Sequence, residues 1–310
     1  MTTRGELVAG VDLGGTNLRV GIVGSDGTVL AFESVPFDAR IGPVAGVRHI
    51  ADRVAATVRE TGGGRLAAIG IGATGPVDVL AGRIRNPHTL PTWDDVDVCG
   101  PLAERFGVPV TLDNDAVVAA IGEWWQGAGQ GTDVVAMVTF GTGIGVALVC
   151  ASGPYRGSAE AHPEAGHQVV DPEGPRCYCG SRGCWEQLAS GSALSAMAAS
   201  SEDAGVRAAG AQGLSALVQS GNAEASRILD RAAHYAALGL VNVVAFYAPA
   251  TVVLGGGAMN AYRSRLPAMQ ALLDQSLSYL PPGRVPLVEA TLGERGGAVG
   301  AAYLAAQVRK

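Results

Sequence analysis

The sequence predicts an α/β protein built from two related domains, and three observations lead to this prediction. The chain has 310 residues, roughly twice the length of an average domain. Short apolar segments of strand length alternate with longer segments in which apolar residues recur every three or four positions. A strand, glycine turn and strand near the N-terminus recur about 128 residues later, which favours a duplicated domain over one doubly wound sheet.

Apolar runs and turn residues place the elements of the first half. Helices are expected over Val44–Glu60, where apolar residues lie three and four positions apart, and over Ala116–Trp124. Residues Asn86–Val98 are rich in proline and aspartate, so we expect a loop over a pocket. The strands expected in this half are Leu7–Val11, Leu18–Val23, Ala67–Ile71 and Val108–Leu112.

The second half repeats the opening pattern and then becomes more helical. Strands are expected at Val134–Phe140 and Ile144–Cys150, on either side of a glycine turn, and later at Thr251–Leu254. The helices expected in this half are Gly191–Ala199, Gly213–Ser220, Ala223–Tyr247 and Ala298–Arg309.

The two halves are joined without a low-complexity linker, so we expect a short hinge near residue 115. The smaller α/β domain would comprise residues 1–115 and 296–310. The larger domain would comprise residues 116–295 and carry a metal-binding segment.

Composition and charge exclude several classes of function. The net charge of −6 argues against a surface for nucleic acid or anionic lipid. Lys310 is the only lysine, so neither a Walker-A phosphate loop nor a Schiff-base enzyme is expected. The uncharged stretch Ala232–Tyr262 is interrupted by Pro249 and three glycines, which favours a buried helix and strand over a membrane span. The first apolar segment is too short for an export signal, and a cytoplasmic protein is therefore expected.

Three glycine turns suggest nucleotide binding. In Asp12-Leu13-Gly14-Gly15-Thr16-Asn17, the glycines would let backbone N–H groups approach a phosphate, and the carboxylate could hold a hydrated Mg²⁺. Taken alone, this turn is better explained as a tight hairpin. Its chemistry recurs at Gly141-Thr142-Gly143, and Gly255-Gly256-Gly257 follows a strand and would suit a flat adenosine group. The residues expected at ATP are Asp12, Gly14, Gly15, Thr16, Asn17, Gly141, Thr142, Gly143, Gly255, Gly256 and Gly257.

These motifs give the chain a resemblance to the ROK family of sugar kinases, within the hexokinase–actin superfamily. The resemblance covers nearly the whole chain and implies a two-domain, ribonuclease H-like fold with an interdomain cleft. A homodimer or higher homo-oligomer is also implied. The blocks that carry it are Asp12–Asn17, Leu112–Glu123, Phe140–Gly145, and Glu164-Ala165-Gly166-His167 followed by Cys177-x-Cys179-Gly180-x-x-Gly183-Cys184-x-Glu186.

Phosphoryl transfer to an alcohol needs a base, and Asp115 is the candidate. One of Asp113, Asn114 and Asp115 is also expected to cap the helix that follows, which is the usual task of such residues. Trp93 could stack on the sugar or anchor its own loop. The resemblance implies that Asp115 is the catalytic base and that the sugar is bound by Gly75, Asn86, Asn114, Asp115, Glu164, His167 and Glu186.

Three cysteines and a histidine have the spacing of a structural zinc site. Three thiolates and one imidazole would make a closed tetrahedral set without an open position for water. Disulfides and buried thiols without a ligand are the alternatives, and the lack of an export signal argues against disulfides. The expected ligands are His167, Cys177, Cys179 and Cys184, with Cys99 and Cys150 as ordinary thiols. His167 would use its two ring nitrogens to bridge the metal and the sugar.

The chain departs from the family pattern at positions that bear on the sugar. Val117 stands where asparagine is usual, Val146-Ala147 where glycines are usual, and His162-Pro163 ahead of Glu164. We expect an ATP- and Mg²⁺-dependent kinase for the 6-hydroxyl of a glucopyranose-type hexose, either glucose or an amino-sugar such as kanosamine. The alternatives are a kinase for N-acetylmannosamine, N-acetylglucosamine, fructose or allose, or an inactive sugar sensor. A repressor is not expected, because the phosphate motif begins at Asp12.

Overall fold

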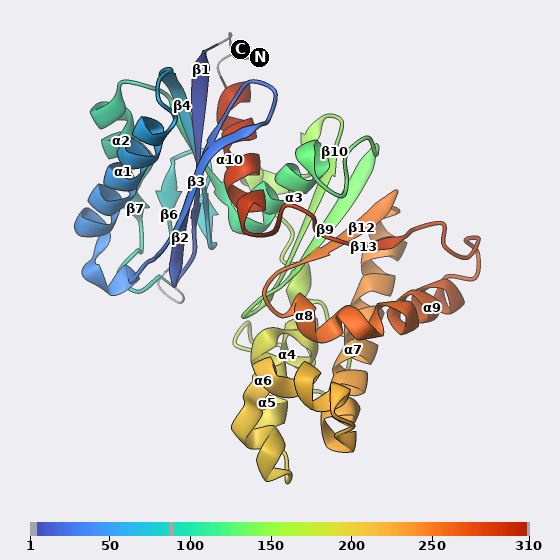
Figure 1. The fold of residues 1–310 in the computed structure, drawn as a ribbon. Helices are drawn as coiled ribbons and strands as arrows, with labels where there is room; N and C mark the ends of the chain where they lie inside the picture. The colour runs from blue at the N-terminus through green and yellow to red at the C-terminus, as the bar shows by residue number, and fades with distance from the viewer. Residues whose placement is uncertain (1–4, 87–89, 309–310) are drawn as a thin grey trace. The chain divides into compact units, whose positions relative to one another are not determined.

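The computed structural model describes residues 5–86 and 90–308 (Figure 1). Its contacts divide the chain into two compact units. The first comprises residues 1–131, 149–162 and 291–310, and the second residues 132–148 and 163–290. The domain boundary expected near residue 115 stays a prediction. The contact-based units differ from it because the helix that begins at Asp115 packs within the first unit, against the C-terminal helix.

The first unit is built on a five-stranded sheet of order β3-β2-β1-β4-β8. Strands β1, β2 and β3 are antiparallel neighbours, whereas β4 and β8 run parallel to β1. The strands are β1 (Glu6–Leu13), β2 (Asn17–Val23), β3 (Val29–Pro36), β4 (Arg65–Ala73) and β8 (Val110–Asn114). A small sheet of order β5-β6-β7 comprises β5 (Val77–Asp78), β6 (Arg83–Ile84) and β7 (Val96–Asp97).

Helices cover both faces of this sheet (Figure 1). On one face lie α1 (Pro43–Glu60) and α2 (Cys99–Phe106), and on the other lie α3 (Asp115–Gln126) and α10 (Gly296–Gln307). Helix α10 touches the sheet backbone directly, since a Cβ at Gly10 would lie 1.7 Å from the Ala298 carbonyl oxygen. The expected end of this helix at Arg309 lies outside the described residues.

A second five-stranded sheet has the order β11-β10-β9-β12-β13. β12 is buried along its whole length and pairs in parallel with β9 on one side and with the edge strand β13 on the other. Its strands are β9 (Val134–Phe140), β10 (Ile144–Cys150), β11 (Gly153–Pro154), β12 (Thr251–Gly255) and β13 (Leu287–Glu289). The helices of the second unit are α4 (Trp185–Ala189), α5 (Gly191–Ala199), α6 (Ala204–Gln219), α7 (Ala223–Tyr247), α8 (Met259–Tyr262) and α9 (Leu266–Ser276). Short 3₁₀ turns occur at Ala39–Ile41, Ser158–Glu160, Ala165–His167, Arg263–Arg265 and Gly293–Arg295.

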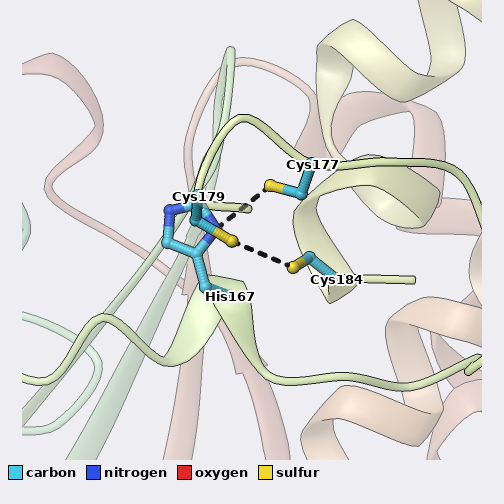
Figure 2. Close-up of side chains that lie close together, drawn as sticks. All are labelled: His167, Cys177, Cys179 and Cys184. Carbon is cyan, nitrogen blue, oxygen red and sulfur yellow. Dashed lines mark hydrogen bonds between the residues drawn. The ribbon is translucent and has the colours of Figure 1, made fainter. Parts of the chain in front are cut away.

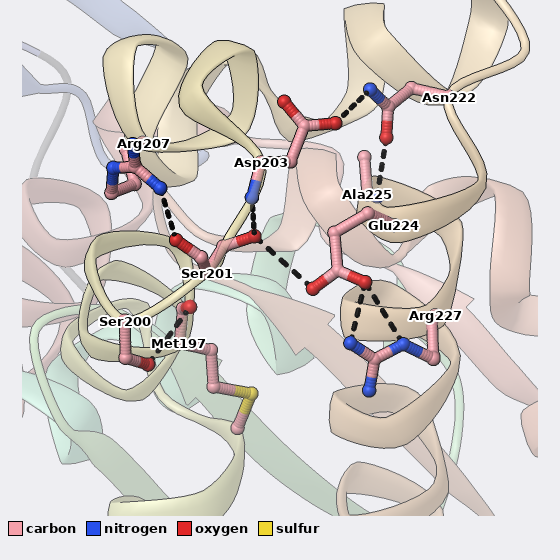
Figure 3. A network of polar contacts seen from close by, with 9 residues as sticks. All are labelled: Met197, Ser200, Ser201, Asp203, Arg207, Asn222, Glu224, Ala225 and Arg227. Carbon is pink, nitrogen blue, oxygen red and sulfur yellow. Dashed lines mark hydrogen bonds and ion pairs between the residues drawn. The ribbon is translucent and has the colours of Figure 1, made fainter.

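The starts of α6 and α7 are joined by a polar network (Figure 3). Asp203 caps α6 by accepting hydrogen bonds from two backbone N–H groups, and Asn222 caps α7 by accepting one from Ala225 N. The Asn222 amide also donates to Asp203 at 2.9 Å, which couples the two helix starts. Helix α6 begins nine residues before the expected start at Gly213. Its first half is rich in alanine, contains Gly210 in a non-helical conformation, and has no clear apolar period from which the earlier start could be predicted.

The long uncharged stretch resolves as expected into helix, break and strand. Helix α7 ends at Tyr247, and Ala248 turns the chain with a φ of 44° before β12. Among the helices in residues 5–86 and 90–308, none has the length and apolar character that crossing a membrane requires.

Candidate active site and metal centre

The first glycine turn connects β1 to β2 as a tight hairpin. The Gly14 N–H donates to the Asn17 carbonyl at 3.0 Å, while Gly15 and Thr16 are exposed. The hairpin is therefore present, and its tip still offers accessible backbone and a hydroxyl group. The expected phosphate contact stays a prediction.

Asp12, at the end of β1, carries an unfavourable negative charge. Burial and the nearby Asp115 carboxylate raise its pKa from the ordinary 3.8 to about 6, although Arg19 opposes the shift. The Arg19 guanidinium lies 3.2 Å from Asp12 and 3.4 Å from Glu294. Two of the acidic residues predicted from sequence, Asp12 and Asp115, are thus close enough to influence each other's ionisation.

The three polar residues at the end of β8 have separate tasks. Asn114 is the helix cap, because its side-chain oxygen accepts from Ala116 N at 2.8 Å and Val117 N at 3.3 Å. Asp113 is almost fully buried and forms a two-pronged ion pair with Arg156. Asp115 begins α3, and its carboxylate accepts a hydrogen bond from Ala116 N at 2.8 Å.

Gly75 and Asn86 lie in the same unit as Asn114. Gly75 is next to the Asn114 side chain, and Asn86 holds the backbone beside Gly75. A Cβ at Gly75 would lie 2.9 Å from Asn114 Nδ2 and 3.5 Å from His162 Cε1. Asn86 is buried and donates to the Thr74 carbonyl at 3.0 Å, so it fixes the backbone next to Gly75. Trp93 is also buried, and its ring N–H donates to the Ala39 carbonyl at 3.1 Å, which makes it an anchor for its loop.

In the second unit, the turn at Gly141-Thr142-Gly143 is held from two sides. Glu186 accepts a hydrogen bond from Ile144 N at 3.0 Å, directly after the turn. Gly191, at the start of α5, donates to the Gly141 carbonyl at 2.8 Å. The turn is therefore tied to Glu186, a residue predicted at the sugar, and to the N-terminal end of α5.

The third glycine turn lies against the second. Ala258 N donates to the Phe140 carbonyl at 2.8 Å, and a Cβ at Gly256 would come within 2.4 Å of the same oxygen. Gly256 also has a φ of 91°, which an L side chain rarely adopts. The structure thus brings together two of the segments predicted to contact the nucleotide.

His167 and three cysteines form one cluster in the second unit (Figure 2). Their potential ligand atoms all lie within 4.8 Å of one another. His167 Nδ1 is 3.4 Å from Cys177 Sγ, and Cys179 Sγ is 3.5 Å from Cys184 Sγ. All five cysteines are free thiols, and Cys99 and Cys150 take no part in the cluster. The four ligands predicted from sequence are therefore adjacent in space, and Glu164 comes just before the His167 turn.

Two residues near the predicted site were not anticipated. Tyr178 lies within the cysteine motif, and its ring is 5.0 Å from the His167 ring. Desolvation, followed by the charge and hydrogen bond of Glu186, raises the pKa of the Tyr178 phenol. Its position between two ligand cysteines could have indicated it. Arg156 is the second, and the sequence around it offers no comparable signal.

The ROK family profile matches residues 8–308 of the chain. The chain belongs to the ROK family. A glucokinase from Thermotoga maritima is 33% identical over 95% of this chain and 96% of its own length. The ROK hexokinase structure from Thermus thermophilus has 35% identity and a TM-score of 0.86, covering 98% of this chain and 99% of that one. A ROK glucokinase from Streptomyces griseus, solved with glucose and AMPPNP, has 32% identity and a TM-score of 0.79 over 97% and 99% of the two chains.

These similarities confirm the predicted family and fold class. The ROK chain described here has the actin-like ATPase fold of the hexokinases that it matches over nearly their entire length. The roles of the individual site residues stay predictions from the sequence and the local geometry.

Proposed function

We propose that this ROK protein transfers the γ-phosphoryl group of ATP to the 6-hydroxyl of a glucopyranose-type hexose. The coarser statement, an ATP-dependent sugar kinase, follows from full-length similarity to ROK glucokinases. The acceptor position and the sugar are the proposal. The observation that carries it is the placement of Asp115 at the first turn of α3, electrostatically coupled to Asp12 at the first glycine turn.

Asp115 acts as the general base in this proposal. From the N-terminal end of α3, its carboxylate would accept the proton of the sugar hydroxyl as the oxygen attacks the γ-phosphorus. The bond between the γ-phosphorus and the β–γ bridging oxygen breaks in the same step, and ADP leaves. Asn114 would present its amide N–H to a sugar hydroxyl, because its side-chain oxygen is already used as the helix cap. Gly75 leaves room for that amide.

Asp12 is suited to a cation. Partial burial and then a second acid raise the pKa of the Asp12 carboxyl, and a positive charge bound nearby would stabilise its ionised form. Magnesium, when bound through Asp12 and ATP, would neutralise the charge on the phosphates. The residues of this chain that would contact the phosphates are the backbone and Thr16 of the first turn and the Gly141-Thr142-Gly143 turn.

The second unit supplies sugar and adenosine contacts in this proposal. Glu164, His167 and Glu186 would bind the ring hydroxyls, since carboxylate and imidazole groups discriminate hydroxyl patterns that apolar walls do not. Glu186 would also support the phosphate turn through Ile144 N. Gly255, Gly256 and Gly257 would lie along the adenosine.

Zinc fits the cysteine cluster by ligand type and spacing. A tetrahedral zinc with Zn–S bonds of about 2.3 Å holds thiolates about 3.8 Å apart, close to the 3.5 Å between Cys179 and Cys184. His167 Nδ1 is directed at Cys177, which leaves the other side of the ring for the sugar. We assign the metal a structural role, in which it orders the segment between Glu164 and Glu186.

Glucose and kanosamine are the favoured sugars, and a substrate panel tests the proposal. Sugar-dependent ADP release would be measured with glucose, kanosamine, glucosamine, N-acetylglucosamine, N-acetylmannosamine, mannose, fructose and allose. The highest kcat/KM is expected for glucose or kanosamine. A clear preference for an N-acetylated sugar or a ketose would contradict the assigned substrate, and no stimulation by any sugar would contradict kinase activity itself.

A further inference from the structure

Arg156 forms a nearly buried ion pair with Asp113. The guanidinium Nη1 donates to Asp113 Oδ1 at 2.9 Å, and Nη2 pairs with Oδ2, so both carboxylate oxygens are engaged. The side chains are 16% and 3% exposed, respectively. A two-pronged arginine–carboxylate pair fixes orientation as well as distance, and burial protects it from screening by salt.

The Asp113 carboxylate that Arg156 holds lies at the end of β8, two residues before the proposed base, Asp115. Asp113 Oδ1 also accepts a hydrogen bond from Asn114 N at 2.7 Å. The arginine therefore acts on the same oxygen that orients the peptide leading to Asn114 and Asp115. A displacement of the Asp113 side chain would therefore displace that peptide as well.

Arg156 is itself fixed by the segment that follows it. Its Nε lies 3.5 Å from Glu160 Oε2, and Gly157 N donates to the Ala161 carbonyl at 2.7 Å. Ala159 and Glu160 have φ values of 54° and 62°, which non-glycine residues adopt at an energetic cost. A segment held in this conformation gives the guanidinium a defined position relative to β8.

We propose that Arg156 is a positioning residue for phosphoryl transfer, which holds Asp115 toward the acceptor hydroxyl through Asp113. The proposal rests on the proposed function, in which Asp115 is the base. Arg156 need not touch either substrate in this role. Its loss misdirects the base and leaves in place the groups proposed to bind ATP and the sugar contacts of the second unit.

The test compares Arg156→Met, Arg156→Lys and Asp115→Asn in the sugar-dependent ADP-release assay. We expect Arg156→Met to lower kcat by about 10- to 100-fold, because small misplacements of a catalytic group have effects of this size. KM for ATP should stay within about threefold of the wild type, because the groups proposed at the nucleotide are untouched. KM for the sugar should change far less than kcat, because Glu164, His167 and Glu186 stay in place. Arg156→Lys retains the charge but loses the fork and should recover part of kcat. Arg105→Met, which removes an exposed pair with Asp52, is the matched control and should leave kcat unchanged.

A double variant separates positioning from folding. Arg156→Met alone leaves the Asp113 charge buried without its partner, which can unfold the protein. Asp113→Asn combined with Arg156→Met removes that charge and should fold, with kcat still reduced. Normal kcat in a folded Arg156→Met or double variant, beside an inactive Asp115→Asn, would overturn the proposal. A fall in kcat that only follows the unfolded fraction would also overturn it. Full activity of Asp115→Asn would instead refute the proposed function.

Discussion

Replacing Asp12 with asparagine is expected to stabilise the folded protein at neutral pH. The same substitution should abolish phosphoryl transfer, because it removes the carboxylate proposed to hold Mg²⁺. The Asp12 carboxyl is largely withdrawn from solvent near Asp115, and burial followed by the charge of Asp115 raises its pKa from 3.8 to about 6. Ionisation is therefore harder in the folded state than in the unfolded state. The folded protein carries this penalty in full above pH 6, and the penalty disappears as the pH falls below 3.8.

The magnitude follows from the two pKa values. For a carboxyl whose pKa is 3.8 in the unfolded state and about 6 in the folded state, ionisation lowers the free energy of unfolding by about 3 kcal/mol at pH 7.5 and about 1 kcal/mol at pH 4.5. Asparagine keeps the shape of the side chain and carries no charge. We therefore expect Asp12→Asn to raise the thermal midpoint by several degrees at pH 7.5 and by about a third as much at pH 4.5.

The assay is thermal unfolding of the wild type and Asp12→Asn at both pH values, without Mg²⁺. Asp115→Asn should also stabilise at pH 7.5, by less, because its charge is the second cause of the raised pKa after burial. Asp38→Asn is the contrasting control, because Asp38 is exposed and hydrogen bonds from Arg40 lower its pKa, so this substitution should not stabilise the protein at either pH. Destabilisation by Asp12→Asn at pH 7.5, or an equal change at both pH values, would refute the reasoning.

Three further predictions concern other parts of the two units. Gly75→Ala places a Cβ 2.9 Å from Asn114 Nδ2 and should therefore raise KM for the sugar by about tenfold in steady-state kinetics. A rise in KM of less than twofold would contradict a role for Gly75 at the sugar. Removal of metal with a chelator should lower the thermal midpoint and the sugar affinity, and added Zn²⁺ should restore both; an unchanged midpoint in a metal-free sample would contradict a structural metal. Glu123→Ala should destabilise the protein by about 3 kcal/mol in urea unfolding, because the buried carboxylate accepts hydrogen bonds from Thr291 N and Leu292 N. A loss below 1 kcal/mol would show that these donors find other partners.

The sequence predicted the strands and turns whose signals are local. Ala67–Ile71 is a continuous apolar run, and the structure contains it within the buried strand β4. The exposed strand β3 was not anticipated, because it includes Glu33 and Ser34 and lacks a fully buried face. The first half of α6 was missed for a related reason, since its alanines and glycines show no strong period.

The site was predictable where neighbouring residues in the sequence share one task. The cysteine motif places three potential ligands within eight residues, and the structure brings all of them to His167. The choice of helix cap among Asp113, Asn114 and Asp115 required the backbone geometry. The pairing of Asp113 with Arg156 joins residues 43 positions apart, and the sequence contains no pattern that predicts it.

The central claim is that Asp115 is the base of an ATP-dependent hexose kinase, and the kcat of Asp115→Asn tests it most directly. The variant should fold and bind glucose or kanosamine with near wild-type affinity, measured by calorimetry. Its turnover should fall by about 10²- to 10⁴-fold, the usual contribution of a general base. Turnover within tenfold of the wild type, in a folded variant that binds the sugar, would contradict the account.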